Sequence, residues 1–102
     1  MLKLKPSCEH CDKPLPANST EAMICSFECT FCCDCVENIL LNVCPNCGGG
    51  FASRPIRTAK EYFGGVSLKQ YPASNEKVLK PVDENQHQLF AKAIKNIPAE
   101  ER

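Results

Sequence analysis

Eight of the nine cysteines in this 102-residue chain form four closely spaced pairs in its first half. Their members are Cys8 and Cys11, Cys25 and Cys29, Cys32 and Cys35, and Cys44 and Cys47. A gap of two or three residues lets one loop present two thiolates to one ion, so each pair is half of a tetrahedral zinc site. Four halves predict two structural Zn²⁺ ions, with all eight thiolates as ligands.

Disulfides are the rival use of so many cysteines. The odd count and the tight spacing favour metal, and the opening residues 1–5 lack the apolar segment of a secretion signal. No apolar stretch approaches membrane-spanning length. We therefore expect a cytoplasmic protein stabilised by zinc, because a segment this short buries too little apolar surface to fold unaided. The ninth cysteine, Cys33, remains as a candidate free thiol.

The charge of the chain argues against a nucleic-acid partner. Net charge is zero overall, but residues 1–50 carry −3 and residues 51–102 carry +3. Each all-thiolate zinc site would add two further negative charges to the first half, which is the wrong sign for a phosphate backbone. Arg54, Arg57 and Lys60 form a small basic cluster that could bind nucleic acid or pack against the acidic half.

Short elements must position the cysteines. Residues 22–24 and 30–32 read as two strands joined by a turn over residues 26–28. A helix should follow, with Asp34 as N-cap and Glu37 at the capping-box position. Its apolar stripe has helical spacing and consists of Val36, Ile39, Leu40 and Val43. Pro45 should end this helix, and residues 44–50 form a tight glycine-rich turn.

The second half carries weaker signals. Residues 52–58 could form an extended strand, and Gly-Gly and Pro breaks then favour a linker. Asp83 and Gln86 predict the start of a second helix that Pro98 ends, with an apolar stripe of Phe90, Ala93, Ile94 and Ile97. The predicted organisation is a two-zinc module over residues 1–53, a partly extended linker over 54–82 and an amphipathic helix over 83–98.

Two wirings suit eight ligands in this order. In the sequential one, the first four cysteines bind one zinc and the last four the other. In the cross-braced one, the first and third pairs share a zinc, as do the second and fourth. Because only two residues separate Cys29 from Cys32, the spacing favours cross-bracing, with the short strand as a spacer between the sites.

The ligand series, with its Cys-Thr-Phe-Cys and Cys-Pro-Asn-Cys steps, resembles a RING finger along residues 8–47. The resemblance implies a small metal-bound α+β fold of the treble-clef type, with a short β-hairpin and one helix, to which this chain adds the C-terminal helix. It implies Phe31 packed against Ile39 and Leu40. It also implies the ligand sets Cys8, Cys11, Cys32 and Cys35 for one zinc, and Cys25, Cys29, Cys44 and Cys47 for the other.

A narrower resemblance lies in residues 1–6 and in the run over residues 22–32. Both are similar to a small bacterial family catalogued as domain of unknown function 1272. Members of that family end soon after a basic segment like the one over residues 54–57. The remainder of this chain is therefore expected to be an addition.

RING fingers typically recruit a ubiquitin-conjugating enzyme through an apolar residue between the first two ligands and often a cation after the last. This chain has Glu9-His10 and Gly48 at those places. Both departures argue against a ligase, and a bacterial host would lack the pathway.

We expect binding rather than catalysis, with another protein as the partner. No Ser/His/Asp set or phosphate-binding loop stands out, and closed all-thiolate sites leave no position for a reacting water. His10 is expected to be exposed, and His87 to be a boundary residue on the second helix, one turn before Phe90. Two alternatives remain: a thiol- or zinc-based redox sensor using Cys33, and a nucleic-acid-binding zinc protein.

Iron–sulfur binding is a further possibility raised by the cysteine spacing. The run from Cys25 to Cys32 has the three-cysteine spacing of radical SAM enzymes, but the chain is several times too short for their barrel. A ferredoxin-like run lacks its fourth ligand at the usual spacing. A colourless protein is therefore expected.

Overall fold

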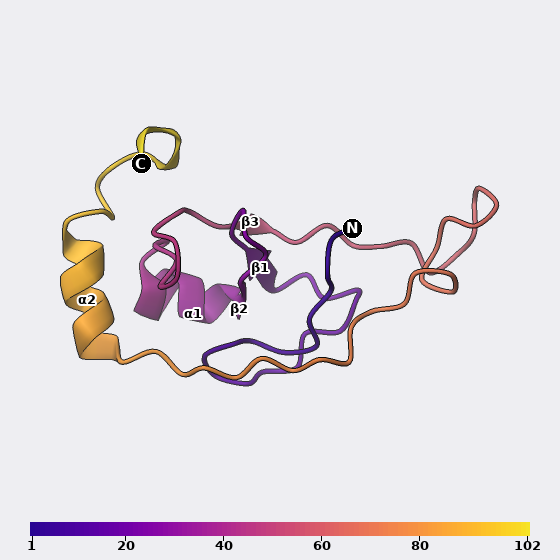
Figure 1. Cartoon of the computed structure of the whole chain (residues 1–102), viewed down its shortest axis with the longest axis horizontal. Coiled ribbons are helices and arrows are strands. Elements are labelled where there is room, and N and C mark those ends of the chain that lie inside the picture. Colours follow the sequence, from indigo (N-terminus) through magenta and orange to yellow (C-terminus); the bar gives the residue numbers. More distant parts are fainter.

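A three-stranded antiparallel sheet lies at the centre of the computed structural model, which describes residues 1–102 (Figure 1). β1 (Ala22–Ile24) pairs with β2 (Thr30–Cys32) on one side and with β3 (Ala52–Ser53) on the other. The first two strands have their predicted bounds. The third is much shorter than the predicted 52–58, and Pro55, which has no N–H to donate, follows closely after it.

The helical segment after β2 starts and ends earlier than predicted. It comprises α1 (Cys33–Cys35) and a π-helical turn, η1 (Val36–Leu40). Its N-cap is Cys32, without a side-chain hydrogen bond, so the prediction of Asp34 as the cap is wrong. Starting the helix directly after β2 carries Cys35 into its first turn.

Pro45 does not end this helix. Leu41 and Asn42 both adopt left-handed conformations, with φ of 55° and 57°, which stop the helix at Leu40. The side chain of Asn42 then accepts a hydrogen bond from the Phe51 N–H at 2.9 Å. The chain is thereby turned toward the last cysteine pair while Val43 is still buried.

The small core lies between the sheet, the helix and the N-terminal loop. Phe31 is 1% exposed and packs with Leu40, and half-buried Ile39 lies against the same cluster, as expected. The Phe51 ring meets Phe31 edge-on, with ring centroids 5.5 Å apart. Leu15 completes the cluster from the N-terminal loop. The core is thus confined to the immediate surroundings of the cysteines.

The C-terminal helix, α2 (Glu84–Lys92), begins as predicted but ends before the predicted Pro98. The Asp83 carboxylate caps it by accepting from the Gln86 N–H at 3.0 Å. A single turn of 3₁₀ helix, η2 (Ala99–Glu101), follows near the C-terminus.

The face of α2 that is buried also differs from the predicted stripe. His87 and Ala91, one turn apart, are buried against η1, whereas Phe90 and Ile97 are 44% and 38% exposed. The small side chain of Ala91 lets the helix approach η1 closely. Only a narrow strip of the helix is therefore covered.

Residues 54–83 contain no helix or strand. They run out into a loop at the end of the molecule opposite α2 and return along the N-terminal segment (Figure 1). The returning limb is hydrogen-bonded to the module, with the Ser74 N–H donating to Leu4 and the Lys80 N–H to Glu9. No helix has the length and apolar character needed to cross a membrane.

Candidate metal centre

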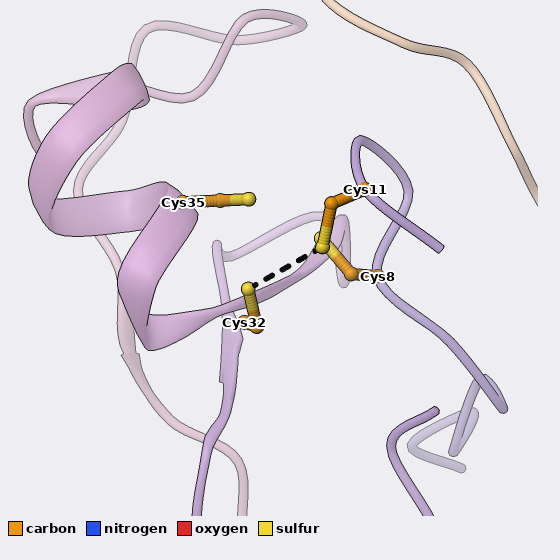
Figure 2. A group of neighbouring side chains, drawn as sticks. All are labelled: Cys8, Cys11, Cys32 and Cys35. Atoms are coloured by element: carbon orange, nitrogen blue, oxygen red, sulfur yellow. Dashed lines mark hydrogen bonds between the residues drawn. The ribbon is translucent and has the colours of Figure 1, made fainter. Parts of the chain in front are cut away.

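Four thiols converge between the N-terminal loop and the start of the helix (Figure 2). The Sγ atoms of this first thiol group all lie within 4.8 Å of one another, and its members are Cys8, Cys11, Cys32 and Cys35. The Cys11 and Cys32 Sγ atoms are 3.7 Å apart. A tetrahedral site with Zn–S bonds of about 2.3 Å has sulfurs about 3.8 Å apart, whereas a disulfide bond is about 2.05 Å long. The spacing therefore fits a shared metal ion.

Local backbone bonds shape the first knuckle, residues 8–13. The Cys8 N–H donates to the Lys13 carbonyl at 2.9 Å, and the Asp12 N–H donates to the Cys8 carbonyl at 3.1 Å. Asp12 takes a left-handed φ of 65° to close this turn. The other two thiols of the group come from the end of β2 and the first turn of α1. The group therefore joins the N-terminal loop to the strand–helix unit.

A second thiol group lies at the opposite end of β2. The Sγ atoms of Cys25, Cys44 and Cys47 are all within 4.8 Å of one another. In the second knuckle, residues 44–49, Gly48 has a φ of 77°, which favours glycine. The Gly49 N–H points at the Cys47 Sγ from 3.4 Å. The predicted glycine-rich turn thus directs a backbone donor at sulfur.

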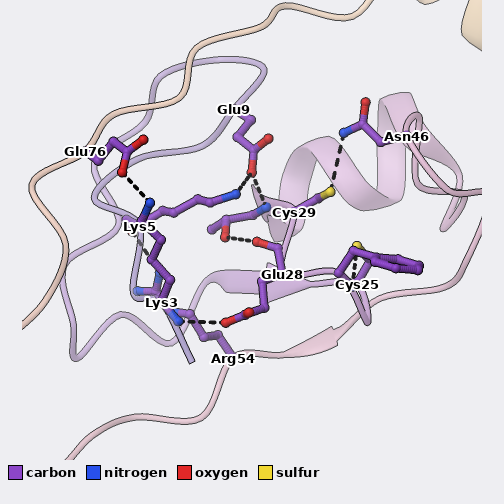
Figure 3. Close-up of polar contacts among 11 residues, drawn as sticks. Lys3, Lys5, Glu9, Cys25, Glu28, Cys29, Asn46, Arg54 and Glu76 are labelled. Carbon is purple, nitrogen blue, oxygen red and sulfur yellow. Dashed lines mark hydrogen bonds and ion pairs between the residues drawn. The ribbon is translucent and has the colours of Figure 1, made fainter. Parts of the chain in front are cut away.

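Cys29 is at the edge of the second group. Its thiol interacts with those of Cys25 and Cys44, but its sulfur is not within 4.8 Å of all three members. The Asn46 side-chain amide donates to the Cys29 Sγ at 3.4 Å (Figure 3). The sulfurs of the first and third pairs thus lie together, and Cys25 of the second pair lies with both members of the fourth. Cross-braced wiring requires this order.

The pKa values of these crowded thiols are shifted in different directions. Burial raises the pKa of Cys35, and the neighbouring Cys32 and Cys8 raise it further. Burial also raises the pKa of Cys44. At Cys8 burial acts in the same direction, but hydrogen bonds from backbone groups outweigh it and lower the pKa. Several thiolates at this spacing repel one another, so ionising all of them requires a cation among them.

Glu9, between the first two cysteines, has a role that the sequence analysis missed. It is 4% exposed, and its Oε2 accepts from the Thr30 N–H at 2.5 Å and from the Lys5 Nζ at 3.0 Å (Figure 3). Thr30 belongs to β2, the strand between the two thiol groups. Glu9 therefore ties the first knuckle to that strand. The only sequence signal was the Lys5–Glu9 spacing of four residues.

We expect Glu9→Gln to lower the free energy of unfolding by about 1.5–3 kcal/mol, the range for a hydrogen bond to a charged group. The substitution keeps the shape of the side chain but leaves the Lys5 ammonium, 14% exposed, without its counter-charge. Urea denaturation measures the change. Glu21→Gln, which breaks an ion pair to Lys13 on the surface, is the control and should have no measurable effect. Equal losses in both variants would contradict this role for Glu9.

The two histidines are held by the backbone. Nδ1 of His10 accepts from the Val82 N–H at 2.8 Å, and the residue is half-buried, so the expectation of exposure is wrong. His87 is 4% exposed, and its Nε2 is 2.9 Å from the Leu40 carbonyl, to which it donates. Neither histidine ring lies among the sulfurs of either thiol group.

In the predicted basic cluster, Arg54 is buried and Arg57 half-buried, while Lys60 is exposed. Arg54 is 3% exposed, and its guanidinium donates to three backbone carbonyls at 2.9–3.1 Å, those of Lys5, Leu15 and Pro16. Arg57 donates to two more, those of Leu2 and Tyr71, both at 2.7 Å. Of the two suggested roles, packing within the protein is the observed one for these arginines. The partners are carbonyl groups rather than acidic side chains.

Cys33 belongs to neither thiol group. It is a half-buried thiol in α1, one residue after Cys32.

Comparison with known proteins places these features in a family. Residues 1–57 match the family described as "Protein of unknown function (DUF1272)". The chain belongs to this family. A protein of Rhizobium meliloti (strain 1021), described as uncharacterised, is 54% identical over 81 residues, covering 79% of this chain and 89% of that protein. No solved structure matches the chain significantly.

Both thiol groups of this DUF1272 protein lie within the family region. The alignment with the Rhizobium protein, at 81 residues, is longer than that region and must continue beyond Arg57. The expectation that the chain after the basic segment is an addition is therefore wrong for this relative, which shares part of it.

Proposed function

We propose that this DUF1272 protein binds two structural zinc ions and acts as a cytoplasmic, non-enzymatic module for binding another protein. The observation that carries the zinc proposal is the convergence of thiols from alternate pairs. Cys8, Cys11, Cys32 and Cys35 would hold the first ion. Cys25, Cys29, Cys44 and Cys47 would hold the second.

The donors of both groups suit zinc in type, and those of the first group also suit it in number and placement. Each set is composed of thiols, the ligands typical of closed structural zinc sites. Backbone N–H groups of Phe27 and Gly49 lie 3.4 Å from the sulfurs of Cys25 and Cys47 and would stabilise their thiolates. When bound, zinc would neutralise the thiolate charge and crosslink segments that share little apolar core.

The thiols and the two histidines support a structural rather than a catalytic role. Four thiolates would fill the coordination shell of each ion and leave no place for a reacting water. Backbone groups bind both His10 and His87. These contacts support a binding module over an enzyme.

The surface favours protein over nucleic acid as the partner. Arg54 and Arg57, the strongest candidates for phosphate contacts, are engaged by backbone carbonyls. Apolar side chains are instead exposed on the loop opposite α2, where Tyr62, Phe63 and Val66 are 69%, 78% and 60% exposed. Exposed apolar groups of this kind are typical of protein contacts.

Cobalt(II) titration of the reduced, metal-free protein tests the metal proposal. Tetrahedral thiolate sites give cobalt strong charge-transfer and visible bands, which should grow until two equivalents are bound. Zinc should then displace the cobalt and abolish the bands. Saturation at one equivalent, or bands typical of octahedral oxygen ligation, would contradict the proposal.

Asn46→Ala should weaken zinc binding at the second site by about 10-fold, the lower end of the range for ligand-supporting hydrogen bonds. The substitution removes the amide that donates to the Cys29 sulfur. Competition with a chromophoric chelator measures both affinities. Asn38→Ala, an exposed position on the helix, is the matched control. Unchanged zinc binding in the Asn46 variant would remove this role for the amide.

A redox sensor is the second candidate, because one cysteine of each thiol group, Cys11 and Cys47, is exposed to oxidants. Zinc ejection by mild peroxide that Cys33→Ser slows would favour the sensor. Ejection at the same rate in that variant would leave Cys33 without a role in it.

A further inference from the structure

The C-terminal arm, residues 74–102, is bound to the first knuckle through its backbone. The Lys80 N–H donates to the Glu9 carbonyl at 2.8 Å, and the Val82 N–H donates to Nδ1 of His10 at 2.8 Å. Glu9 and His10 are the two residues between the cysteines of that knuckle. The position of the arm is therefore tied to the same short loop that presents two thiols.

The arm also covers the second knuckle. A Cβ atom on Gly48 would lie 3.7 Å from both the Phe90 Cζ and the Ile94 Cδ1, so these side chains are close to the glycine backbone. Arg102 donates from Nη1 to the Gly48 carbonyl at 3.2 Å and to the Asn42 carbonyl at 2.8 Å. Gly48 directly follows the last cysteine.

The arm has little order of its own. Its helix, α2, has nine residues, and isolated helices shorter than about 12 residues are marginal in water. Only His87 and Ala91 of α2 are buried, while Leu89 is 74% exposed. A cavity of about 350 Å³ separates part of the arm from the module and is lined by Pro45, Phe90 and neighbouring residues. The arm is thus held by a narrow contact of His87 and Ala91 with η1 and by its contacts with the two knuckles.

We propose that the C-terminal arm is a metal-dependent element, docked when both thiol groups hold zinc and released when the knuckles lose it. The inference rests on the proposed zinc binding. Structural zinc sites order their knuckles on binding metal, so the surface that the arm recognises exists only in the metal-bound state. Release would expose Phe90, Ile94 and the knuckle surface beneath them, which converts metal loss into a change of binding surface.

The coupling is reciprocal. If zinc favours docking of the arm, docking must raise zinc affinity by the same factor, typically about 5- to 150-fold for coupled sites. A variant that weakens only the docking contacts should therefore lose zinc more readily, although it retains every cysteine. This distinguishes coupling from a passive tail.

The experiment uses the full-length double variant Phe90→Ser/Ile94→Ser, with Leu89→Ser as the matched control on the exposed face of the same helix. Zinc affinity is measured by competition with a chromophoric chelator. Hydrogen exchange over residues 84–97 is followed by mass spectrometry with zinc bound and after its removal. Zinc content is determined in the same samples.

We expect the wild-type arm to lose its amide protection when zinc is removed. The double variant should bind zinc at least about 5-fold more weakly, and Leu89→Ser should match the wild type. The inference would be overturned if the protein binds two zinc ions but the amide protection of the arm does not change when they are removed. Unchanged zinc affinity in the double variant would overturn it as well. Either result would leave the proposed function intact. A protein that binds no zinc would overturn both.

Discussion

Cys35→Ser should remove one of two zinc ions and unfold the first half of the protein. Cys35 is 4% exposed, and its sulfur belongs to the first thiol group. Structural zinc contributes about 10–16 kcal/mol in zinc-finger peptides, which is comparable to the whole stability of a typical domain, about 5–15 kcal/mol. The remaining core is too small to compensate for that loss. Zinc content and circular dichroism of the purified variant measure the outcome.

Cys33→Ser is the control for this experiment, because it changes the same atom two residues earlier on the same helix. Cys33 belongs to neither thiol group, so its variant should keep both zinc ions and the wild-type melting temperature. Equal behaviour of the two variants, whether both fold or both fail, would contradict the assignment of Cys35 as a ligand.

Arg54→Met should lower the free energy of unfolding by about 3 kcal/mol or more, because each hydrogen bond to a charged group contributes about 1.5–3 kcal/mol. Methionine keeps much of the aliphatic stem but leaves three backbone carbonyls without their donor. These carbonyls belong to the N-terminal loop that carries the first knuckle. We therefore expect that loop to loosen first, as seen by hydrogen exchange over residues 5–16.

Arg57→Met provides the comparison for this effect. Arg57 also donates to two carbonyls, but it is only half-buried, so water can replace the lost donor. Chemical denaturation should show a clearly smaller loss than for Arg54→Met. If the two variants lose the same stability, burial of the Arg54 guanidinium is not what makes its contacts important.

The cysteine spacing predicted more of this protein than any other feature. It favoured the arrangement in which the first pair meets the third, because only two residues separate Cys29 from Cys32 and β2 (Thr30–Cys32) keeps these two sulfurs apart. The hairpin bounds were also predictable from short apolar runs between cysteines. Local spacing is informative here because so much of the module is a turn or a short element.

Other features depended on contacts distant in sequence and could not be read from it. The first helix ends at Leu40 because Leu41 and Asn42 adopt left-handed conformations and turn the chain toward the second knuckle, and Pro45 was the wrong choice of helix-ending residue. The contact of α2 with η1 buries only His87 and Ala91. The apolar stripe of the helix therefore predicted the wrong buried face.

Buried charge was the least predictable part. Arg54 looked like a surface cation in a basic cluster, and Glu9 looked like a departure from a docking surface. Both are internal, and apart from Lys5 beside Glu9 their partners are backbone groups about 20 to 50 residues away along the chain. Backbone donors and acceptors leave no signature in the sequence.

Native mass spectrometry of the purified protein, with an absorption spectrum of the same sample, tests the central claim most directly. A mass corresponding to the chain with two zinc ions, and no visible colour, is the predicted result. One zinc ion, no metal, or a brown iron-containing protein would contradict the two-site assignment.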